Sequence, residues 1–338
     1  TLSLHDALPI SRWDPELDAR GRRVAVIGTG ASAIQVIPEL AKAAEHLTVY
    51  QRTPPWVIPR RDGPVPERKK RWLRSVPLLG WLMRAGLYLT HELLGTALFS
   101  QPRLGRLAER RARRHLEAQV PDPALREKLT PNYRIGCKRV LLSNDYYPAL
   151  SQAHVEVVDR GVTAVRPGEI VAEDGTRRPA DILVLATGFE VTQFMAPLEV
   201  HGRGGVRLAD RWADGAEAHL GVTVPDFPNL FILLGPNTGL GHNSVVFMIE
   251  AQIHYVLRLL EKARRAGLER IAVRAETLRA FTAELERRLQ KTVWNAGGCR
   301  SWYLDENGRN VFLWPGYTVE YWLRTRRPKL RDFEPAPR

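Results

Sequence analysis

A short apolar segment that runs straight into two closely spaced glycines carries the clearest chemistry in the sequence. Arg23-Val-Ala-Val-Ile27 is followed by Gly-Thr-Gly-Ala-Ser-Ala and an amphipathic stretch, which predicts a strand, a tight turn and a helix. Gly28 permits the turn, Gly30 lets the backbone approach a pyrophosphate, and the small Ala33 lets the helix pack on the strand. Phosphates favour such a helix N-terminus. The predicted dinucleotide-binding residues are Gly28, Thr29, Gly30, Ala31, Ser32 and Gln35. The alternative is a strand and helix whose glycines serve only packing.

The residues after the next predicted strand, residues 47–50, select the nucleotide. About twenty residues past the first glycine, an NAD site places a carboxylate on the ribose 2′-hydroxyl, but this chain has Gln51-Arg52-Thr53. Arg52 suits a 2′-phosphate instead. A charge-assisted hydrogen bond is worth about 1.5–3 kcal/mol, or a roughly ten- to hundredfold preference for NADPH over NADH.

The composition is that of a globular α/β protein with room for one large or two ordinary domains, at 338 residues and 44% apolar content. A net charge of +13 would suit nucleic acid or an acidic membrane. No nucleic-acid motif is present and the basic residues are spread out, so nucleic acid is not expected as a partner. The two cysteines, Cys137 and Cys299, offer neither a disulfide framework nor a metal cluster, which is typical of the cytoplasm.

The first ten residues do not fit the rest of the chain. Thr-Leu-Ser-Leu-His-Asp-Ala-Leu-Pro-Ile resembles one reading frame of a sequencing adapter, so we expect residues 1–10 to be an artefact outside the fold and the natural protein to extend further at its N-terminus. Residues 11–21 read as a linker.

Residues 66–130 predict an inserted, basic helical segment. Its apolar residues recur at intervals of three, four and seven, and Arg84, His91 and Glu92 interrupt the most apolar part, so no membrane span is expected. A solvated basic face over an apolar core face is favoured. A membrane-surface contact stays open, because Trp72 and several leucines share the segment with Lys69.

Further strands and helices complete the α/β pattern. Strands are predicted at residues 155–158, in a hairpin around Asp174-Gly175, at 182–185 and at 231–234. A helix from about Asn243 to before Gly267 carries an apolar face, and another runs over about 276–292. The apolar face of the first helix comprises Val246, Ile249, Ile253, Val256 and Leu260. Asn243 is expected to be its N-cap.

The ordered motifs together resemble a class B flavoprotein monooxygenase, and specifically a Baeyer–Villiger monooxygenase. The resemblance covers about residues 11–333. It is carried by residues 28–35, Gln51-Arg52-Thr53, Gly136-Cys-Lys-Arg139, Asp145-Tyr-Tyr147, Ala186-Thr-Gly-Phe189, Gly235-Pro-Asn-Thr238 and Ser301-Trp-Tyr303. Trp13 matches the end of the family's Phe-x-Gly-x-x-x-His-x-x-x-Trp fingerprint, but Pro9 stands where the histidine belongs.

The resemblance implies a flavoprotein with two dinucleotide-binding domains. Residues 22–185 would form a Rossmann-like NADPH domain with the helical insert, residues 186–325 the returning part of an FAD and substrate domain, and residues 326–338 a tail. The family's first glycine motif, which holds the FAD pyrophosphate, is absent from this chain, so the fragment alone is expected to be inactive.

The implied reaction uses NADPH, FAD and O₂ to insert one oxygen atom into a ketone, through a flavin peroxide, giving an ester or lactone. Arg139 matches the family's active-site arginine, and a guanidinium supplies the permanent positive charge that a peroxyanion needs. Lys138 and Arg52, with Thr53, match the residues that read the 2′-phosphate. Trp302 matches an aromatic near the nicotinamide ribose, and Asn237 and Thr238 would line the flavin or shape the turn.

Two other functions stay open from the sequence. A flavin monooxygenase that oxidises nitrogen or sulfur uses the same two cofactors, although Phe189 and the Lys138-Arg139 pair favour the Baeyer–Villiger branch. A non-catalytic NADPH-binding remnant would leave Lys138, Arg139 and Trp302 without a shared site. The substrate and the oligomeric state are not readable from the sequence.

Overall fold

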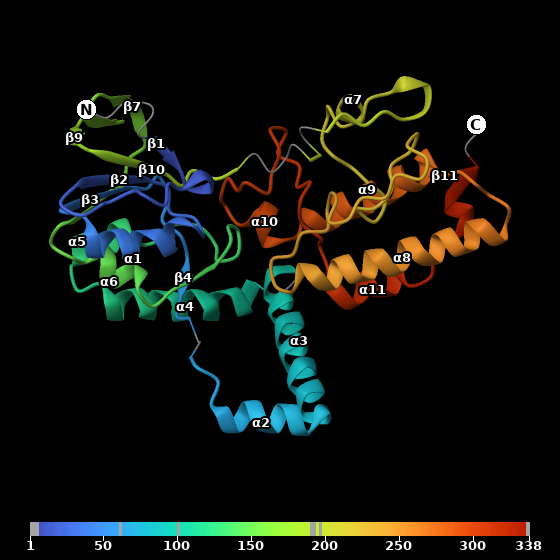
Figure 1. Cartoon of the computed structure of the whole chain (residues 1–338), viewed down its shortest axis with the longest axis horizontal. Helices are drawn as coiled ribbons and strands as arrows, with labels where there is room; N and C mark the ends of the chain where they lie inside the picture. The colour runs from blue at the N-terminus through green and yellow to red at the C-terminus, as the bar shows by residue number, and fades with distance from the viewer. Residues whose placement is uncertain (1–6, 61–62, 100–101, 190–193, 196–197, 336–338) are drawn as a thin grey trace. The chain divides into compact units, whose positions relative to one another are not determined.

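A computed structural model describes residues 7–60, 63–99, 102–189, 194–195 and 198–335 (Figure 1). The chain divides into two units. Unit 1 comprises residues 1–63 and 106–189, and unit 2 comprises residues 64–105 and 190–338. Residues 64–105, which the sequence assigns to the first domain, therefore group with unit 2, while the domain boundaries inferred from the resemblance stay a prediction.

A five-stranded parallel sheet forms the centre of unit 1. In spatial order its strands are β1 (Ala7–Pro9), β10 (Ile182–Leu185), β2 (Arg23–Ile27), β3 (His46–Tyr50) and β6 (Val155–Val158). The predicted strands at 23–27, 47–50, 155–158 and 182–185 are confirmed. The chain leaves β2 toward β3 on one side and returns as β10 on the other, so the strand order reverses at β2, where such sheets bind ligands.

Residues 7–9 belong to this sheet, so leaving residues 1–10 out of the fold is wrong for these three. Ala7 lies opposite Leu183 and Pro9 lies opposite Leu185 in parallel register. The edge of β10 presents backbone N–H and C=O groups that any extended segment can satisfy, whatever its side chains. Residues 1–6 lie outside the described part of the chain.

The sheet is covered on both faces, as parallel sheets are. Val24 and Val26 point to the face that packs against α1 (Ala33–Ala43) and α6 (Tyr146–Leu150), while Ala25 points to the opposite face. The opposite face packs against an antiparallel sheet of β7 (Val162–Arg166), β8 (Glu169–Ala172) and β9 (Arg177–Pro179). The hairpin predicted at Asp174-Gly175 joins β8 and β9. The other elements of unit 1 are β4 (Val57–Ile58), β5 (Leu141–Leu142), α5 (Pro123–Lys128) and most of α4 (Pro102–Gln119).

Gly28 lies where β2 and β10 come closest. Its φ is +116°, and a Cβ atom there would lie 2.3 Å from the carbonyl oxygen of Ala186. A Cβ at Gly30 would meet nothing within 4 Å. The two glycines of the motif thus have different roles, because only Gly28 is required by the fold.

Unit 2 is built mainly from helices. Its elements are α2 (Glu67–Ser75), α3 (Pro77–Phe99), α7 (Leu208–Arg211), α8 (Val245–Arg265), β11 (Ile271–Val273), α9 (Ala275–Leu289), α10 (Val293–Ala296), α11 (Thr318–Thr325) and β12 (Phe333–Pro335). The helices predicted from Asn243 and over 276–292 are confirmed as α8 and α9. Tyr255, Phe281, Trp314 and Tyr321 are buried in the core between α8, α9 and α11.

The strand predicted over Phe231–Leu234 does not form. Leu234 has a φ of +56°, and its N–H donates to Oε1 of Gln252, 2.9 Å away on α8. Gln252 is fully buried and its amide also donates to the Tyr321 hydroxyl. A side chain of α8 therefore satisfies the backbone that a neighbouring strand would otherwise pair.

The face of α8 that packs differs from the one that the apolar periodicity indicates. Met248, Tyr255 and Leu259 are buried, whereas Val246 and Leu260 are 57% and 41% exposed. Both faces are apolar, so the pattern alone cannot choose between them. Ser244, not Asn243, occupies the N-cap position.

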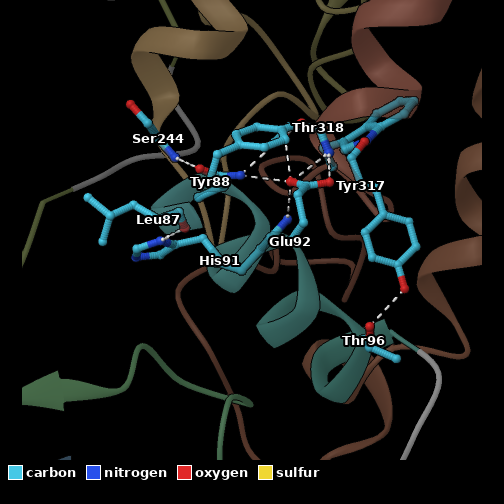
Figure 2. Close-up of polar contacts among 11 residues, drawn as sticks. Leu87, Tyr88, His91, Glu92, Thr96, Ser244, Tyr317 and Thr318 are labelled. Atoms are coloured by element: carbon cyan, nitrogen blue, oxygen red, sulfur yellow. Dashed lines mark hydrogen bonds and ion pairs between the residues drawn. The ribbon is translucent and has the colours of Figure 1, made fainter. Parts of the chain in front are cut away.

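A buried carboxylate joins α3 to the start of α11 (Figure 2). Glu92 is 6% exposed and accepts hydrogen bonds from the Thr318 N–H at 3.1 Å, the Thr318 hydroxyl at 2.6 Å and the Asn243 amide at 2.7 Å. Thr318 is the first residue of α11, where a negative charge is favourable. The Tyr88 hydroxyl lies 2.9 Å from that of Thr318, and those of Thr96 and Tyr317 are also 2.9 Å apart. These bonds fix the C-terminal half of α3 to the rest of unit 2.

Replacing Gly28 with alanine should destabilise unit 1. The new Cβ would clash with the Ala186 carbonyl and the backbone would keep an unfavourable positive φ, so we expect Gly28→Ala to lower the free energy of unfolding by about 2 kcal/mol or more. Gly30→Ala, the matched control, should change it by under about 0.5 kcal/mol. Urea unfolding followed by circular dichroism measures both, and equal effects would contradict the assignment.

Removing the Glu92 carboxylate should weaken unit 2. Glu92→Ala leaves the Thr318 N–H and the Asn243 amide without their acceptor in a buried place, so we expect a loss of about 3 kcal/mol in the free energy of unfolding. The control is Glu67→Ala on α2, whose side chain is 76% exposed and pairs with Lys70 at the surface, and which should cost under about 0.5 kcal/mol. A Glu92→Ala protein as stable as the control would show that the hydrogen bonds of Glu92 to Thr318 and Asn243 do not stabilise unit 2.

Candidate nucleotide-binding site in unit 1

Three loops of unit 1 carry most of the residues predicted to bind the nucleotide, together with Arg139, the arginine predicted to act in the reaction. Gly28–Ser32 follow β2, Arg52 and Thr53 follow β3, and Lys138 and Arg139 precede β5. The first two loops are in contact, because the Gly28 N–H donates to the Tyr50 carbonyl at 3.1 Å and the Thr29 hydroxyl lies 3.4 Å from the Thr53 carbonyl oxygen. Because β2 and β3 are parallel neighbours, these first two loops lie at the same edge of the sheet, which is the edge where such folds bind dinucleotides.

The N-terminus of α1 is open to an anion. Ser32 occupies the N-cap position without a side-chain capping bond, and the first turn of the helix contains no acidic residue. The Gln35 amide donates to the Ala31 carbonyl at 2.7 Å, so it braces the turn. The space in front of Gly30 and the partial positive charge of the helix end are what a pyrophosphate requires.

Two cations approach each other beside this turn. Burial lowers the pKa of the Lys138 ammonium, and the positive charge of Arg52 lowers it further. Arg52 is exposed, and within the described part of the chain its side chain has no ion-pair partner. An anion placed against both groups would relieve their repulsion and favour the charged form of Lys138.

Tyr133 fixes the loop that carries Lys138, and the sequence analysis missed it. The Lys138 Nζ lies 5.4 Å from the centre of the Tyr133 ring, a cation–π distance. The Tyr133 hydroxyl donates to the Pro54 carbonyl at 3.0 Å, and the Trp56 indole donates to the Tyr133 carbonyl at 2.8 Å. Burial raises the pKa of Tyr133 to about 12, so it stays a neutral donor. An aromatic five residues before the lysine was the only signal in the sequence.

Arg139 lies in the same loop but is exposed. It stands two residues before β5, which pairs in parallel with β4 so that Leu141 lies opposite Val57. Among the described residues, no hydrogen bond or ion pair involves the Arg139 side chain. A guanidinium that no carboxylate neutralises is available to a bound group.

The three remaining predicted residues belong to unit 2. The Asn237 amide donates to the Asn310 carbonyl at 2.7 Å, and the buried Thr238 hydroxyl donates to the Gly235 carbonyl at 2.6 Å. The Thr238 side chain therefore shapes its own turn, whereas the Asn237 side chain ties the turn to the segment at residues 310–313. Trp302 is 43% exposed, and its ring lies 4.3 Å from that of Tyr303 and 5.0 Å from that of Phe312, centre to centre.

Other kinds of site find less support. In the part of the chain that the structure describes, no three His, Cys, Asp or Glu residues are grouped to hold a metal ion. Neither Cys137 nor Cys299 is a free thiol, so the expectation of reduced cysteines is not met. Of the described helices, none has both the length and the apolar character to cross a membrane.

The chain is similar to monooxygenases throughout its length. It is 45% identical over 317 residues to a Baeyer-Villiger monooxygenase of Pseudomonas aeruginosa, covering 94% of this chain and 60% of the relative. It is 44% identical over 331 residues to a Baeyer-Villiger monooxygenase of Streptomyces coelicolor, covering 97% of this chain and 64% of the relative. No protein-family model matches the chain.

The fold is shared with solved structures of the same kind. A steroid monooxygenase solved in its oxidised form with NADP matches with a TM-score of 0.78 and 29% identity, over 95% of this chain and 67% of that one. The resemblance inferred from the motifs and the predicted α/β fold with two dinucleotide-binding domains are thus confirmed. By sequence and by fold, the chain is similar to the Baeyer-Villiger monooxygenases named above, and it spans about three fifths of their length.

Proposed function

We propose that unit 1 binds NADPH and that the whole protein uses NADPH, FAD and O₂ to oxidise a ketone to an ester or lactone. The observation that carries the proposal is the open N-terminus of α1 beside the Arg52 and Lys138 cations, which no carboxylate neutralises within the described residues. The names of the two bacterial relatives and the NADP bound to the steroid monooxygenase support it.

The described residues fit NADPH well. The pyrophosphate would lie against Gly30 and the first turn of α1, with Thr29, Ala31 and Ser32 around it and Gln35 bracing the turn. The 2′-phosphate would lie between Arg52 and Lys138, with Thr53 beside it. Because a guanidinium presents several donors in a plane, it suits a phosphate better than a lone ammonium does.

The fit to FAD is narrower. FAD, when bound, supplies the reaction with oxygen. In unit 2 the turn at Gly235–Thr238 and the exposed Trp302 are the candidates to approach a cofactor. The side chains of this turn are already hydrogen-bonded, however: that of Thr238 to Gly235 and that of Asn237 to the carbonyl groups of Asn310 and Leu313. Contact with FAD would therefore come from the backbone of this turn.

Arg139 is assigned to the reaction itself. Its guanidinium cannot lose its proton near neutral pH, so it holds a fixed positive charge. In a site closed to water, such a charge stabilises an anionic oxidant and the developing charge of the ketone oxygen. The exposure of Arg139 leaves it able to face a bound group.

Nucleotide selection by Arg52 is tested by calorimetry on the chain itself. We expect Arg52→Ala to raise the Kd of NADP⁺ about ten- to hundredfold while changing the Kd of NAD⁺ little, because only NADP⁺ carries the 2′-phosphate. Arg22→Ala is the control, since Arg22 is also exposed but precedes β2 at the opposite end of the strand. A ratio of the two constants that does not move would remove Arg52 from phosphate recognition.

The role of Arg139 is tested in the whole protein with FAD bound. Arg139→Ala should leave reduction of the flavin by NADPH intact, measured as bleaching of its absorbance, and should lower ester formation from a ketone by about a hundredfold or more. Unchanged product formation would refute the assignment. Parallel assays on a thioether distinguish the reaction from sulfur oxidation: a protein that oxidises only the thioether is not a Baeyer–Villiger enzyme.

A further inference from the structure

The outer part of the α2–α3 pair is exposed, and its α3 segment is apolar. No residue from 67 to 91 is buried, although between Pro77 and Phe99 the sequence has Arg84, His91 and Glu92 as its only charged or histidine residues. Leu78 and Trp81 are 62% and 64% exposed. A helix that is apolar all round is normally enclosed by protein or lipid. The described part of the chain does not enclose residues 77–91 of α3.

Only the C-terminal half of α3 is anchored to the rest of unit 2. Residues 81, 85, 88, 92 and 95 recur at helical spacing and share a face. The C-terminal part of this face contains Tyr88 and the buried Glu92, which bond to Thr318, while Trp81 on the N-terminal part is 64% exposed. In Figure 1, α3 leads away from α8 and α11, and α2 lies at its outer end. The anchored half therefore presents the outer half and α2 to the surroundings.

The exposed helix α2 adds positive charge to this tip. In nine residues it contains Arg68, Lys69, Lys70, Arg71 and Arg74 against one acid, Glu67. Glu67 Oε1 pairs with Lys70 Nζ at 2.6 Å, which leaves most of the positive charge uncompensated within the helix. Trp72 stands among these cations and is 61% exposed.

We propose that the tip formed by α2 and residues 77–87 of α3 docks onto an anionic membrane surface. Trp72 and Trp81 have the amphipathic rings that reside at the level of lipid headgroups, and the leucines of α3 would enter the acyl boundary. The cations of α2 would contact the phosphate and carboxylate groups of the lipid headgroups. The docking is peripheral, in agreement with the lack of a membrane-crossing helix among the described residues.

The charge of α2 favours a lipid surface over the other partners. In a symmetric dimer through this tip, the cations of one α2 would face those of the other and repel. A nucleic acid would use the cations but leave the exposed leucines and tryptophans in water. An anionic bilayer satisfies both the positive charge and the apolar side chains.

Co-sedimentation with lipid vesicles tests the proposal on the whole chain, independently of any cofactor. The chain should bind vesicles of phosphatidylcholine and phosphatidylserine at least about tenfold more tightly than pure phosphatidylcholine vesicles, and raising the salt should weaken binding. We expect a loss of about tenfold or more for the double variant Trp72→Ala/Trp81→Ala and for the triple variant Arg68→Gln/Lys69→Gln/Arg71→Gln.

Matched variants in α8 and α9 control for nonspecific adsorption through apolar or positively charged side chains. Val246→Ala/Leu257→Ala removes two side chains of α8 that are 57% and 62% exposed, and Arg279→Gln/Arg287→Gln/Lys291→Gln removes the same charge from and just after α9. Both should bind vesicles as the unaltered chain does. Fluorescence supplies a second readout, because the blue shift on vesicles should disappear in Trp72→Phe/Trp81→Phe although seven of the nine tryptophans remain.

Three results would overturn the proposal. Equal losses in the control variants would show that the net charge of +13, and not the tip, binds lipid. Self-association that disappears in Trp72→Ala/Trp81→Ala, without vesicle binding by the unaltered chain, would make the tip a contact between copies. Absence of vesicle binding by a chain that stays monomeric would refute docking outright.

Discussion

The close approach of two backbones at Gly28 is the constraint on which unit 1 depends. β2 and β10 are neighbours in the parallel sheet, and the turn after β2 passes so near Ala186 that a side chain cannot fit. After this close approach the chain enters α1, and the N-terminus of the helix lies at the edge of the sheet where β3 also ends. The open space at Gly30 and the residues Arg52 and Thr53 lie at this same edge, so the packing constraint and the candidate nucleotide site share one turn.

Two positively charged side chains complete the candidate nucleotide site at this turn. Arg52 and Lys138 come from loops separated by more than eighty residues of sequence, yet they influence each other because Tyr133 ties one loop to Pro54 in the other. Two cations held close together without a carboxylate are unfavourable by themselves. Such an arrangement is expected where a bound anion compensates the repulsion, and strained electrostatics of this kind are typical of binding sites.

Local patterns predicted much of the fold, and long-range contacts account for the failures. The strand, turn and helix around Gly28 are encoded within a few residues, and Arg52 was found by its spacing from that glycine. Leu234 was assigned to a strand because it belongs to a short apolar run. In the structure its N–H donates to Gln252 on α8 instead of to a neighbouring strand. Glu92 and Thr318 are 226 residues apart, and no local pattern connects them. Periodicity found an apolar face on α8, but the neighbours of the helix decide which face is buried.

The central claim, that unit 1 recognises a 2′-phosphate, is tested most directly with fragments of the nucleotide. Calorimetric titration of the chain with adenosine 2′,5′-bisphosphate and with adenosine 5′-monophosphate compares ligands that differ only in that group. We expect the bisphosphate to bind at least about tenfold more tightly, through Arg52 and Lys138. Equal affinities would contradict it and would leave the glycine turn as an element of packing alone.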